Sequence, residues 1–423
     1  MQKLRLQLKN QKFSNSLKIV KLKQVIVDII SGNWGKEESN EDSLLCKVLR
    51  GTDFSKAQDG FFDDVPTRFI KKESFNKLKL EQGDILIELS GGSRDQPTGR
   101  ILIWRDNLNK NTKNIIFSNF VKKFKLDYSR IEPEYFYRYW QHLYFLGRTA
   151  KYEKRTTGIR NFKYYDFIEN EKIPLPPLSE QKKIVYVLDN IQEVIRTQEK
   201  IIEKTKELKK TLLNEIFNSK IKNQKWIKLG DEKYFEIKLG GTPRTNRSDY
   251  WNGKIYWITP NDLNKLSSPH ITRTERKITG RGLKTGSTLL SAKSIILSTR
   301  APIGYLAILN EDMAFNQGCK GIIIKKPDEI FNLYLFYYLT TQVNKLKDWG
   351  SGSTFRELST PGLKQFSIPL IDIKKQREIA EILQTIDQKI EIEQKKKALY
   401  EELFRTTLNK LMTGEIKVDN LKL

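Results

Sequence analysis

Residue types that commonly perform catalysis are few and scattered in this chain. The two cysteines and the two histidines lie far apart and form no Cys-x-x-Cys or His-x-x-x-His spacing; they are Cys46, Cys319, His142 and His270. Zinc sites and disulfide frameworks need closely spaced ligands of these types. We therefore expect no metal site, no disulfide and a reducing compartment.

Motifs of a methyltransferase or a nuclease are also missing. An adenine methyltransferase needs a cofactor loop and an Asp-Pro-Pro-Tyr type tetrapeptide, but LPPL at 175–178 lacks the preceding acid or amide and the following aromatic residue. GRGLKTGST at 280–288 lacks the Gly-Lys-Ser/Thr ending of a phosphate-binding loop, which predicts a flexible basic turn. Asp84 and Glu88 belong to no nuclease-like cluster of carboxylates and lysine. The sequence predicts a binding protein that leaves catalysis to partners.

The charge balance favours a polyanionic partner. The chain of 423 residues has 76 Lys and Arg against 51 Asp and Glu, a formal net charge of +25 and a pI near 9.7. A lysine-rich proteome from an AT-rich genome is the alternative explanation. Tyr and Trp scattered among Arg and Lys favour nucleic acid instead.

Loops beside predicted strands carry the residue types that contact DNA. Lys and Arg bind phosphates, and Arg, Asn, Gln, Ser and Thr can hydrogen-bond to base edges. The DNA-binding candidates of the first half are Ser90, Ser93, Arg94, Gln96, Arg100, Lys154, Arg155, Thr156 and Arg160. Those of the second half are Thr242, Arg244, Asn246, Arg247, Thr299, Arg300, Asn316, Gln317, Ser353, Thr354 and Arg356. Any single residue could cap a turn instead, but the set favours DNA.

The elements that position these loops occur twice. IPLPPLSEQ at 173–181 returns as IPLIDIKKQ at 368–376, and the offset of 195 residues (376 − 181) also superposes apolar residues farther along. Each copy introduces a helical apolar pattern, over about 179–219 and 374–413. Ser179 is a suitable N-cap for the first helix.

Both predicted helices have apolar ends and polar centres. Exposed apolar stripes of this length are unfavourable, so we expect the helices to pair with each other. Gly414 can end the second helix. The alternative is that each helix only packs on its own globular domain.

Two globular stretches, about 18–170 and 226–366, show a similar order of features. Each has two strand candidates, at 84–89 and 100–104 in the first and at 294–299 and 305–309 in the second. An aromatic helix follows in each, from Pro133 and from near Pro327. Its helical spacing predicts a core position rather than a stacking platform.

Four segments together resemble the DNA-specificity subunit of type I restriction-modification systems. They are IPLPPLSEQ, its copy IPLIDIKKQREIA, LGGTPRT…YWNGKIYWITPNDL at 239–263, and APIGYLAI…NQGCKGI at 301–323. The resemblance spans the chain from about residue 18. It implies an α+β fold, with two globular target-recognition domains of mixed β-sheet, two long conserved helices that pair antiparallel between them, and a pseudo-two-fold internal repeat.

The resemblance also implies a domain plan. The expected parts are target-recognition domain 1 at 1–172, a central conserved helix at 173–222, target-recognition domain 2 at 223–367 and a C-terminal conserved helix at 368–423. The first half lacks the GGTP and WITP segments and offers only ISGNWGKEES at 30–39. Ile371 and Asp372 replace Pro176 and Pro177 before the second helix, which predicts a looser helix start.

The function implied is non-catalytic recognition of a bipartite, asymmetric site on double-stranded DNA. Implied partners are two modification subunits, which would bind S-adenosylmethionine and methylate adenine, and ATP-dependent translocase and endonuclease subunits for restriction. The chain itself would hold no cofactor. No run of eighteen apolar residues and no signal-peptide core is present, so we expect a cytoplasmic protein without a membrane partner. A solitary methyltransferase or nuclease and a coiled-coil adaptor are the competing interpretations.

Overall fold

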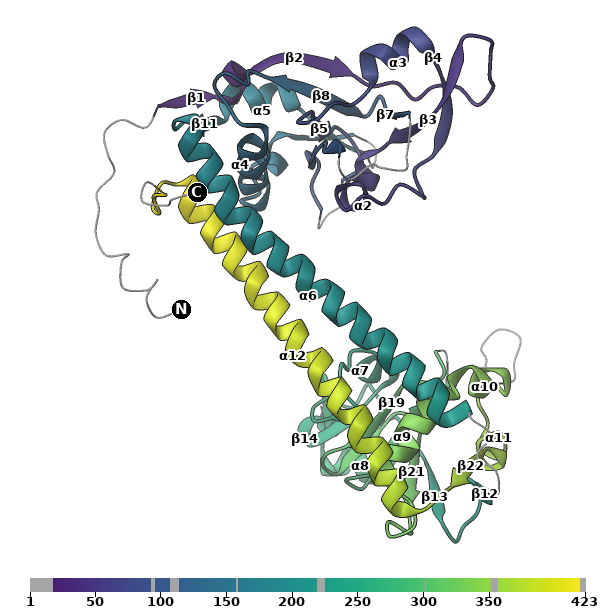
Figure 1. Cartoon of the computed structure of the whole chain (residues 1–423). Helices are drawn as coiled ribbons and strands as arrows, with labels where there is room; N and C mark the ends of the chain where they lie inside the picture. Colours follow the sequence, from purple (N-terminus) through teal and green to yellow (C-terminus); the bar gives the residue numbers. More distant parts are fainter. Residues whose placement is uncertain are drawn as a thin grey trace. The chain divides into compact units, whose positions relative to one another are not determined.

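The computed structural model describes residues 18–92, 96–106, 114–156, 159–218, 225–300, 302–350 and 357–418, and for Arg155, Thr156, Ile159 and Asn218 it describes the backbone alone. The chain divides into two compact units (Figure 1). Unit 1 contains Met1–Arg196 and Leu399–Leu423, and unit 2 contains Thr197–Ala398. Each unit combines β-sheets with helices.

Unit 1 is built on two β-sheets. The first has the spatial order β2 (Ile26–Ser31), β8 (Val121–Leu126), β5 (Ile85–Glu88) and β6 (Ile101–Ile103). The second has the order β4 (Thr67–Lys71), β3 (Ser43–Leu49) and β7 (Ile115–Phe117). Strand β3 is antiparallel to β4 and parallel to β7, so this sheet is mixed. The strands predicted at 84–89 and 100–104 are confirmed as the buried strands β5 and β6.

Unit 2 is also built on two sheets. The first has the order β13 (Phe235–Leu239), β21 (Cys319–Ile324), β18 (Ile295–Ser298), β19 (Leu306–Leu309) and β15 (His270–Ile271). The second has the order β16 (Arg276–Ile278), β14 (Trp251–Ile258), β20 (Met313–Phe315) and β17 (Thr288–Leu290). Strand β14 is antiparallel to β16 and parallel to β20. The predicted strands at 294–299 and 305–309 are confirmed as β18 and β19.

The two units share one topology. Strand β3, between antiparallel β4 and parallel β7, corresponds to β14 between β16 and β20. Strand β8, between β2 and β5, corresponds to β21 between β13 and β18. An isolated bridge joins Ser90 to Asn161 in unit 1, and its counterpart joins Arg300 to Glu357 in unit 2. The predicted internal repeat is confirmed, and it includes the sheets.

Three two-stranded sheets complete the strand pattern: β1 (Ile19–Lys21) with β11 (Lys172–Pro174), β9 (Glu153–Thr156) with β10 (Ile159–Phe162), and β12 (Lys225–Lys228) with β22 (Ser367–Leu370). The isoleucines that open the repeated motif, Ile173 and Ile368, lie in β11 and β22 and are buried.

Short helices connect the strands: α2 (Phe54–Gln58), α3 (Lys72–Leu78), α5 (Tyr164–Asn170), α7 (Pro260–Asn264), α8 (Gly280–Gly286), α10 (Val343–Asp348) and α11 (Thr360–Gln365), with 3-10 turns η1 (Leu22–Val25), η2 (Gly51–Asp53), η4 (Thr149–Tyr152) and η5 (Ser248–Tyr250). The prediction of a flexible turn at 280–288 is wrong, because this stretch forms α8 and the start of β17. The Thr279 hydroxyl accepts a hydrogen bond from the Gly282 N–H at 3.1 Å and caps α8.

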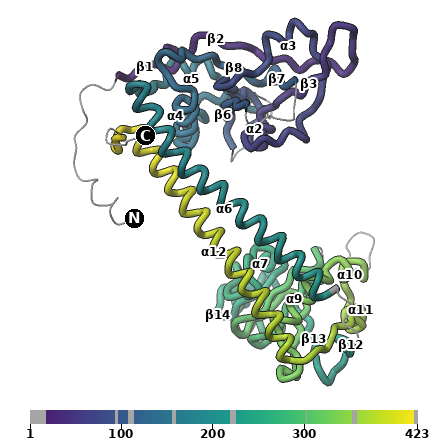
Figure 2. The backbone as a smooth tube through the Cα atoms, viewed as in Figure 1, coloured from purple at the N-terminus to yellow at the C-terminus, as the bar shows by residue number. Residues whose placement is uncertain are grey.

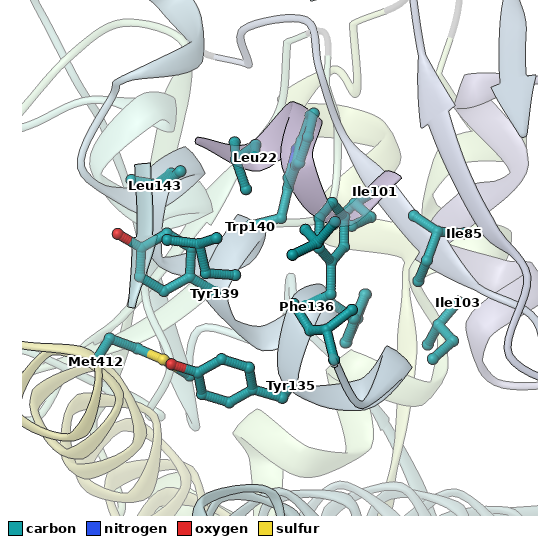
Figure 3. Packing of buried hydrophobic residues seen from close by; sticks show 14 of the residues in the cluster. Leu22, Ile85, Ile101, Ile103, Tyr135, Phe136, Tyr139, Trp140, Leu143 and Met412 are labelled. Atoms are coloured by element: carbon teal, nitrogen blue, oxygen red, sulfur yellow. The ribbon is translucent and has the colours of Figure 1, made fainter. Parts of the chain in front are cut away.

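The aromatic helices form the cores, as predicted. Helix α4 (Pro133–Phe145) begins at its proline and places Phe136 and Trp140 beside Ile85 and Ile101 of the sheet (Figure 3). Helix α9 (Asn332–Thr341) is buried along most of its length. The predicted start of α9 near Pro327 is wrong, since that proline lies in a turn five residues earlier.

The two long helices, α6 (Leu178–Asn218) and α12 (Ile373–Met412), pair antiparallel. In unit 1, Leu188 near the start of α6 shares the core with Leu408 near the end of α12. In unit 2, Leu213 near the end of α6 packs against the core that contains Leu383 near the start of α12. Within each unit, the segments of α6 and α12 lie side by side in the backbone trace (Figure 2). Within the described part of the chain, no helix has the length and apolar character needed to cross a bilayer.

A buried glutamine explains the repeated motif. The Gln181 side chain accepts a hydrogen bond from the Glu132 N–H at 2.8 Å and donates to the carbonyls of Arg130 and Pro176 at 3.0 and 2.8 Å. The Gln376 side chain accepts from the Phe331 N–H at 2.9 Å and donates to the carbonyls of Glu329 and Ile371, both at 2.8 Å. Each glutamine thus ties the first turn of a long helix to the start of an aromatic helix.

The helix ends differ from expectation in two ways. Ser179 lies inside α6 rather than at its N-cap. The start of α12 is not loose, because the Asp372 carboxylate accepts from the N–H groups of Lys374 and Lys375 at 2.9 and 3.3 Å. Gly414, at a φ of 72°, follows α12 as predicted.

Polar side chains occupy the centre of the helix pair, all within unit 2. The Gln198 amide donates a hydrogen bond to the Glu393 carboxylate. The Thr205 hydroxyl donates to the Ile201 carbonyl of its own helix at 2.7 Å, and Lys397 forms an ion pair with Glu199 at 2.8 Å. These contacts fix which residues of α6 and α12 face each other.

Candidate nucleic-acid interface

The GGTPRT loop of unit 2 follows β13 and is held by two tryptophans of β14. The indole N–H of Trp257 donates to the Gly241 carbonyl, and that of Trp251 donates to the Arg244 carbonyl, both at 3.1 Å. The GGTPRT and YWNGKIYW segments therefore occur together for a structural reason, because the two tryptophans of the second segment hold the backbone of the first. The loop is presented in a defined conformation.

Glycines let this loop lie against neighbouring backbone. A Cβ at Gly240 would overlap the Asn316 carbonyl oxygen, and one at Gly241 would overlap the Gly286 carbonyl oxygen. The Gly241 N–H donates to the Phe315 carbonyl at 2.9 Å. The loop is thereby packed on the turn that follows β20.

Five of the predicted DNA-binding residues come together around that turn. The Thr242 hydroxyl hydrogen-bonds to the Gln317 side chain, and the Asn316 amide lies 3.4 Å from the Thr242 hydroxyl. The backbone N–H groups of Thr299 and Arg300 both point to the Gly318 carbonyl, at 2.8 and 3.3 Å. We call Thr242, Thr299, Arg300, Asn316 and Gln317 the unit 2 loop cluster.

The members of this cluster differ in exposure. Thr299 is fully buried, and its hydroxyl accepts from the Lys320 ammonium at 3.1 Å. Lys320 also donates to the Leu358 carbonyl at 2.7 Å, and burial lowers its pKa. Arg300 is exposed and forms an ion pair with Glu357 at 3.0 Å. Thr299 therefore supports the turn, while Arg300 and Gln317 face solvent.

Three further candidates extend from the GGTPRT loop. Arg244, Asn246 and Arg247 are all exposed. The Arg247 guanidinium forms an ion pair with Asp249 at 2.9 Å and lies over the Tyr250 ring at 5.3 Å. The hydrogen bond that Arg247 donates to the Asp249 carboxylate lowers the pKa of the Asp249 carboxyl.

In unit 1 two of the predicted arginines, Arg100 and Arg160, pair with buried carboxylates. The Arg100 guanidinium makes a two-nitrogen contact with Glu88, whose side chain is fully buried. The Arg160 guanidinium contacts Glu153 at 3.3 Å. Glu153 also accepts from the Thr98 N–H at 2.7 Å and joins the 96–100 loop to the β9–β10 hairpin.

The structure describes five further unit 1 candidates. Ser90 bridges to Asn161 of the hairpin, and Gln96 and Lys154 are exposed. Arg155 and Thr156 belong to β9 by their backbone. Ser93, Arg94, Ser353, Thr354 and Arg356 lie outside the described residues.

The segment ISGNWGKEES at 30–39, which the sequence offered in place of a GGTP loop, contains the unit 1 equivalent of that loop, although none of its residues was among the predicted DNA-binding residues. The Asn33 N–H donates to the Phe117 carbonyl at 2.9 Å, as the Gly241 N–H does to Phe315. A Cβ at Gly32 would overlap the carbonyl oxygens of Phe117 and Ser118. The sequence feature that could have revealed this loop is the glycine that directly follows β2 in unit 1 and β13 in unit 2. Arg276, which stacks on Trp251 in unit 2, was also missed.

The cysteines offer no activated nucleophile. Cys46 and Cys319 are both free and buried, and burial raises their pKa values to about 11 and about 12. A thiol with a raised pKa stays protonated at neutral pH. Among the described residues, His, Cys, Asp and Glu form no group of three or more that could hold a metal ion.

The chain matches the family model of the type I restriction modification DNA specificity domain twice, over residues 17–207 and 213–402. The chain belongs to this family. Its two matches coincide with the duplicated topology, so the chain is a specificity subunit with two DNA-specificity domains. This agrees with the resemblance seen in the sequence.

Individual proteins agree with this assignment. The chain is 26% identical over 417 residues to the putative type I restriction enzyme MjaX specificity subunit of Methanocaldococcus jannaschii, covering 94% of this chain and 93% of the relative. A solved chain from work on assembly and conformational transition of the type I R-M system matches with a TM-score of 0.61 at 18% identity, covering 96% of this chain and 100% of that one. The S subunit from M. genitalium matches with a TM-score of 0.56 at 15% identity, covering 95% and 98%. The specificity subunit therefore has a fold already seen in solved chains.

Proposed function

We propose that this specificity subunit reads a bipartite, asymmetric DNA site, with residues 1–172 as one target-recognition domain and residues 223–367 as the other. The observation that carries the proposal is the repeated loop framework. Asn33 and Gly241 make the same backbone hydrogen bond, to Phe117 and Phe315, at the same distance of 2.9 Å. Each unit thus presents a loop on an equivalent scaffold.

The side chains on the two frameworks differ. Ser90 of unit 1 occupies the bridge position that Arg300 occupies in unit 2. Ser118 of unit 1 lies against Gly32 as Asn316 lies against Gly240. Base recognition depends on the donors and acceptors that side chains present in the groove. Two equivalent scaffolds with different side chains should therefore read different half-sites.

The candidate residues include both kinds of contact that specific binding needs. Arg247 and Lys154 are exposed cations suited to phosphates, and Arg244 is an exposed arginine suited to a guanine edge. Asn246, Gln96 and Gln317 are exposed amides suited to adenine edges. The net charge of +25 favours association with DNA over a broad surface.

Catalysis would come from partner subunits. In this proposal two modification subunits bind S-adenosylmethionine and methylate adenine in the cytoplasm, and restriction subunits translocate and cut DNA. Exposed apolar side chains on the long helices support docking of partners. They are Tyr186, Val194, Leu399 and Leu403 in unit 1, and Ile201, Leu208, Ile382 and Ile392 in unit 2.

A map of methylated adenines tests the proposal. The chain is co-expressed with its modification subunits in a host that lacks adenine methylation, and the chain alone and the modification subunits alone serve as controls. We expect methylation only from the assembled complex, at a site with two different halves separated by an unread gap. A continuous palindromic site, or methylation by the chain alone, would overturn the proposal.

A further inference from the structure

Arg276 of unit 2 stacks on the two tryptophans that hold the GGTPRT loop. Its guanidinium carbon lies 3.7 Å from the ring centroid of Trp251 and 5.2 Å from that of Trp257. The two indoles meet edge to face, with centroids 5.0 Å apart. Trp251 and Trp257 are buried beneath the arginine, whereas Arg276 itself is exposed.

The stack follows from strand register. Arg276 lies in β16 directly opposite Trp257 of β14. Residues directly opposite each other on neighbouring strands place their side chains on the same face. The arginine is thereby held on a rigid strand pair rather than on a loop.

Four other arginines of the candidate interface differ from Arg276 in their partners. Arg100, Arg160, Arg247 and Arg300 each form an ion pair with a carboxylate. Within the described residues, no carboxylate lies in ion-pair distance of Arg276. Its charge is therefore not neutralised by a side chain that the structure describes.

Stacking prepares a guanidinium for an external ligand. The indole covers one face of the planar group and restricts its rotation, while the N–H groups around its edge remain available as donors. A rigid donor loses less conformational entropy on binding than a free surface arginine does. Arg276 thus combines exposure, order and a charge that no described carboxylate pairs with.

The stack lies beside the loop proposed to read DNA. Trp251 donates to the Arg244 carbonyl and Trp257 donates to the Gly241 carbonyl, so the arginine covers the same rings that hold the loop. Strand β16 is at the edge of its sheet, and no further strand pairs with its outer side in the described sheet order. A molecule bound by the GGTPRT loop would lie close to Arg276.

We propose that Arg276 binds a DNA phosphate next to the half-site read by unit 2, an inference that rests on the proposed function. A guanidinium held flat on a sheet cannot extend deep into a groove without leaving its stack. Phosphates lie on the outside of the duplex and reach it there. Two edge N–H groups of arginine match the oxygen atoms of a phosphate. Arg276 therefore sets the position of unit 2 on DNA rather than its sequence preference.

The test measures salt-dependent binding by the assembled complex with its modification subunits. Four forms are compared on the cognate site and on unrelated DNA: wild type, Arg276→Gln, Arg276→Lys and Arg273→Gln. Arg273 is an exposed neighbour for which the structure records no ring contact among the described residues, so Arg273→Gln removes an equal charge without a stack. Thermal unfolding of each form verifies that the variants are folded.

We expect Arg276→Gln to weaken binding to both DNAs by about tenfold, the loss typical of a charge-assisted hydrogen bond. The slope of log affinity against log salt should fall by about 0.9, the value for one phosphate. Arg276→Lys should keep the slope and bind less tightly than wild type, and Arg273→Gln should change affinity less than Arg276→Gln. The methylated site should stay the same in all forms.

Three results would overturn the inference. They are an unchanged slope in a folded Arg276→Gln protein, an equal effect of Arg273→Gln, or a change in the half-site that is methylated. Wild-type binding separates this inference from the proposed function. If the wild-type complex lacks a bipartite site, the proposed function fails; if wild type behaves as expected and Arg276→Gln matches it, only the phosphate contact fails.

Discussion

At the scale of single residues, we expect replacement of Gln181 or Gln376 to lower the stability of the protein measurably. Each buried glutamine satisfies one backbone N–H group and two carbonyls. Gln181→Ala or Gln376→Ala should lower the free energy of unfolding by about 2 kcal/mol, because these backbone groups lose their partners. Gln388→Ala, at an exposed position of α12, is the matched control for denaturant unfolding. Equal stability of the three variants would contradict the role given to these glutamines.

Tyr139 and Tyr338 predict a loss of stability at alkaline pH. They are equivalent residues of α4 and α9, and their hydroxyls donate to the carbonyls of Lys172 and Ser367 at 2.8 and 3.2 Å. Burial raises both pKa values from about 10 to about 12. The folded state therefore binds these protons more tightly than the unfolded state. The stability they contribute is fully present below pH 10 and is lost as the pH rises toward 12.

Unfolding measured across this pH range tests the two tyrosines. Tyr139→Phe and Tyr338→Phe should each reduce the alkaline loss of stability, since each removes one ionisable phenol. Tyr165→Phe, on an exposed ring, should leave that loss unchanged. Identical pH profiles for wild type and both buried variants would show that other groups control alkaline unfolding.

We expect replacement of Arg244 to change the recognition of one half-site only. It is exposed on the GGTPRT loop, and its backbone carbonyl is held by Trp251. Arg244→Ala should remove a base contact worth about 1 to 3 kcal/mol and relax the second half-site, while the first half-site stays intact. Arg247→Ala is the control, because that guanidinium already pairs with Asp249. Methylated-site sequencing would refute the base contact if Arg244→Ala weakened all sequences alike.

Side-chain placement sets the limit of sequence reasoning at this scale. The residue types of the loops were sufficient to find Thr242, Asn316 and Gln317, which the structure brings together. They could not show that Thr299 is buried or that Arg100 pairs with Glu88, because both depend on contacts between distant segments. Arg276 was missed for the same reason, since its stack requires the register between β14 and β16.

At the scale of elements, the polar centre of the helix pair predicts a double-mutant effect. Gln198 is buried and donates to Glu393 of the partner helix. Replacing both by leucine should raise the unfolding temperature, because the pair becomes an apolar contact. Gln198→Leu alone should be less favourable than the double change, since Glu393 loses a partner. Glu391→Leu, elsewhere on α12, is the control.

The affinity for modification subunits is the second property to measure for the Gln198→Leu, Glu393→Leu variant. Polar residues at a helix interface can specify register at some cost in stability. We therefore expect the double leucine variant to bind modification subunits less tightly than wild type although it unfolds at higher temperature. A clear loss of stability would show that the assignment of these two side chains to a buried seam is mistaken.

Helices were predicted better than their starts. The apolar periodicity of 178–218 and 373–412 is local, so the sequence alone was enough to find both helices. The start of α9 was misplaced at Pro327 because it is set by a distant residue. The Gln376 side chain accepts from the Phe331 N–H, and α9 begins at the next residue. The order of strands in the sheets likewise depends on long-range pairing that no local pattern predicts.

At the scale of the whole molecule, the net charge predicts a strong effect of salt. The formal charge of +25 should make affinity for any DNA fall linearly with salt on logarithmic axes. A salt series with cognate and unrelated DNA, bound to the assembled complex, measures both slopes. Binding that does not weaken as salt rises would favour a structural adaptor over phosphate recognition.

The division of unit 1 into two segments has a consequence for biosynthesis. Phe404, Leu408, Leu411 and Val418 belong to its core, yet the ribosome makes them only after all of Thr197–Ala398. At roughly 5 to 20 residues per second, that interval is about 10 to 40 s. Unit 2 is continuous and can complete its core first. During the interval the apolar residues of unit 1 that await α12 remain open to chaperones, proteases or other nascent chains.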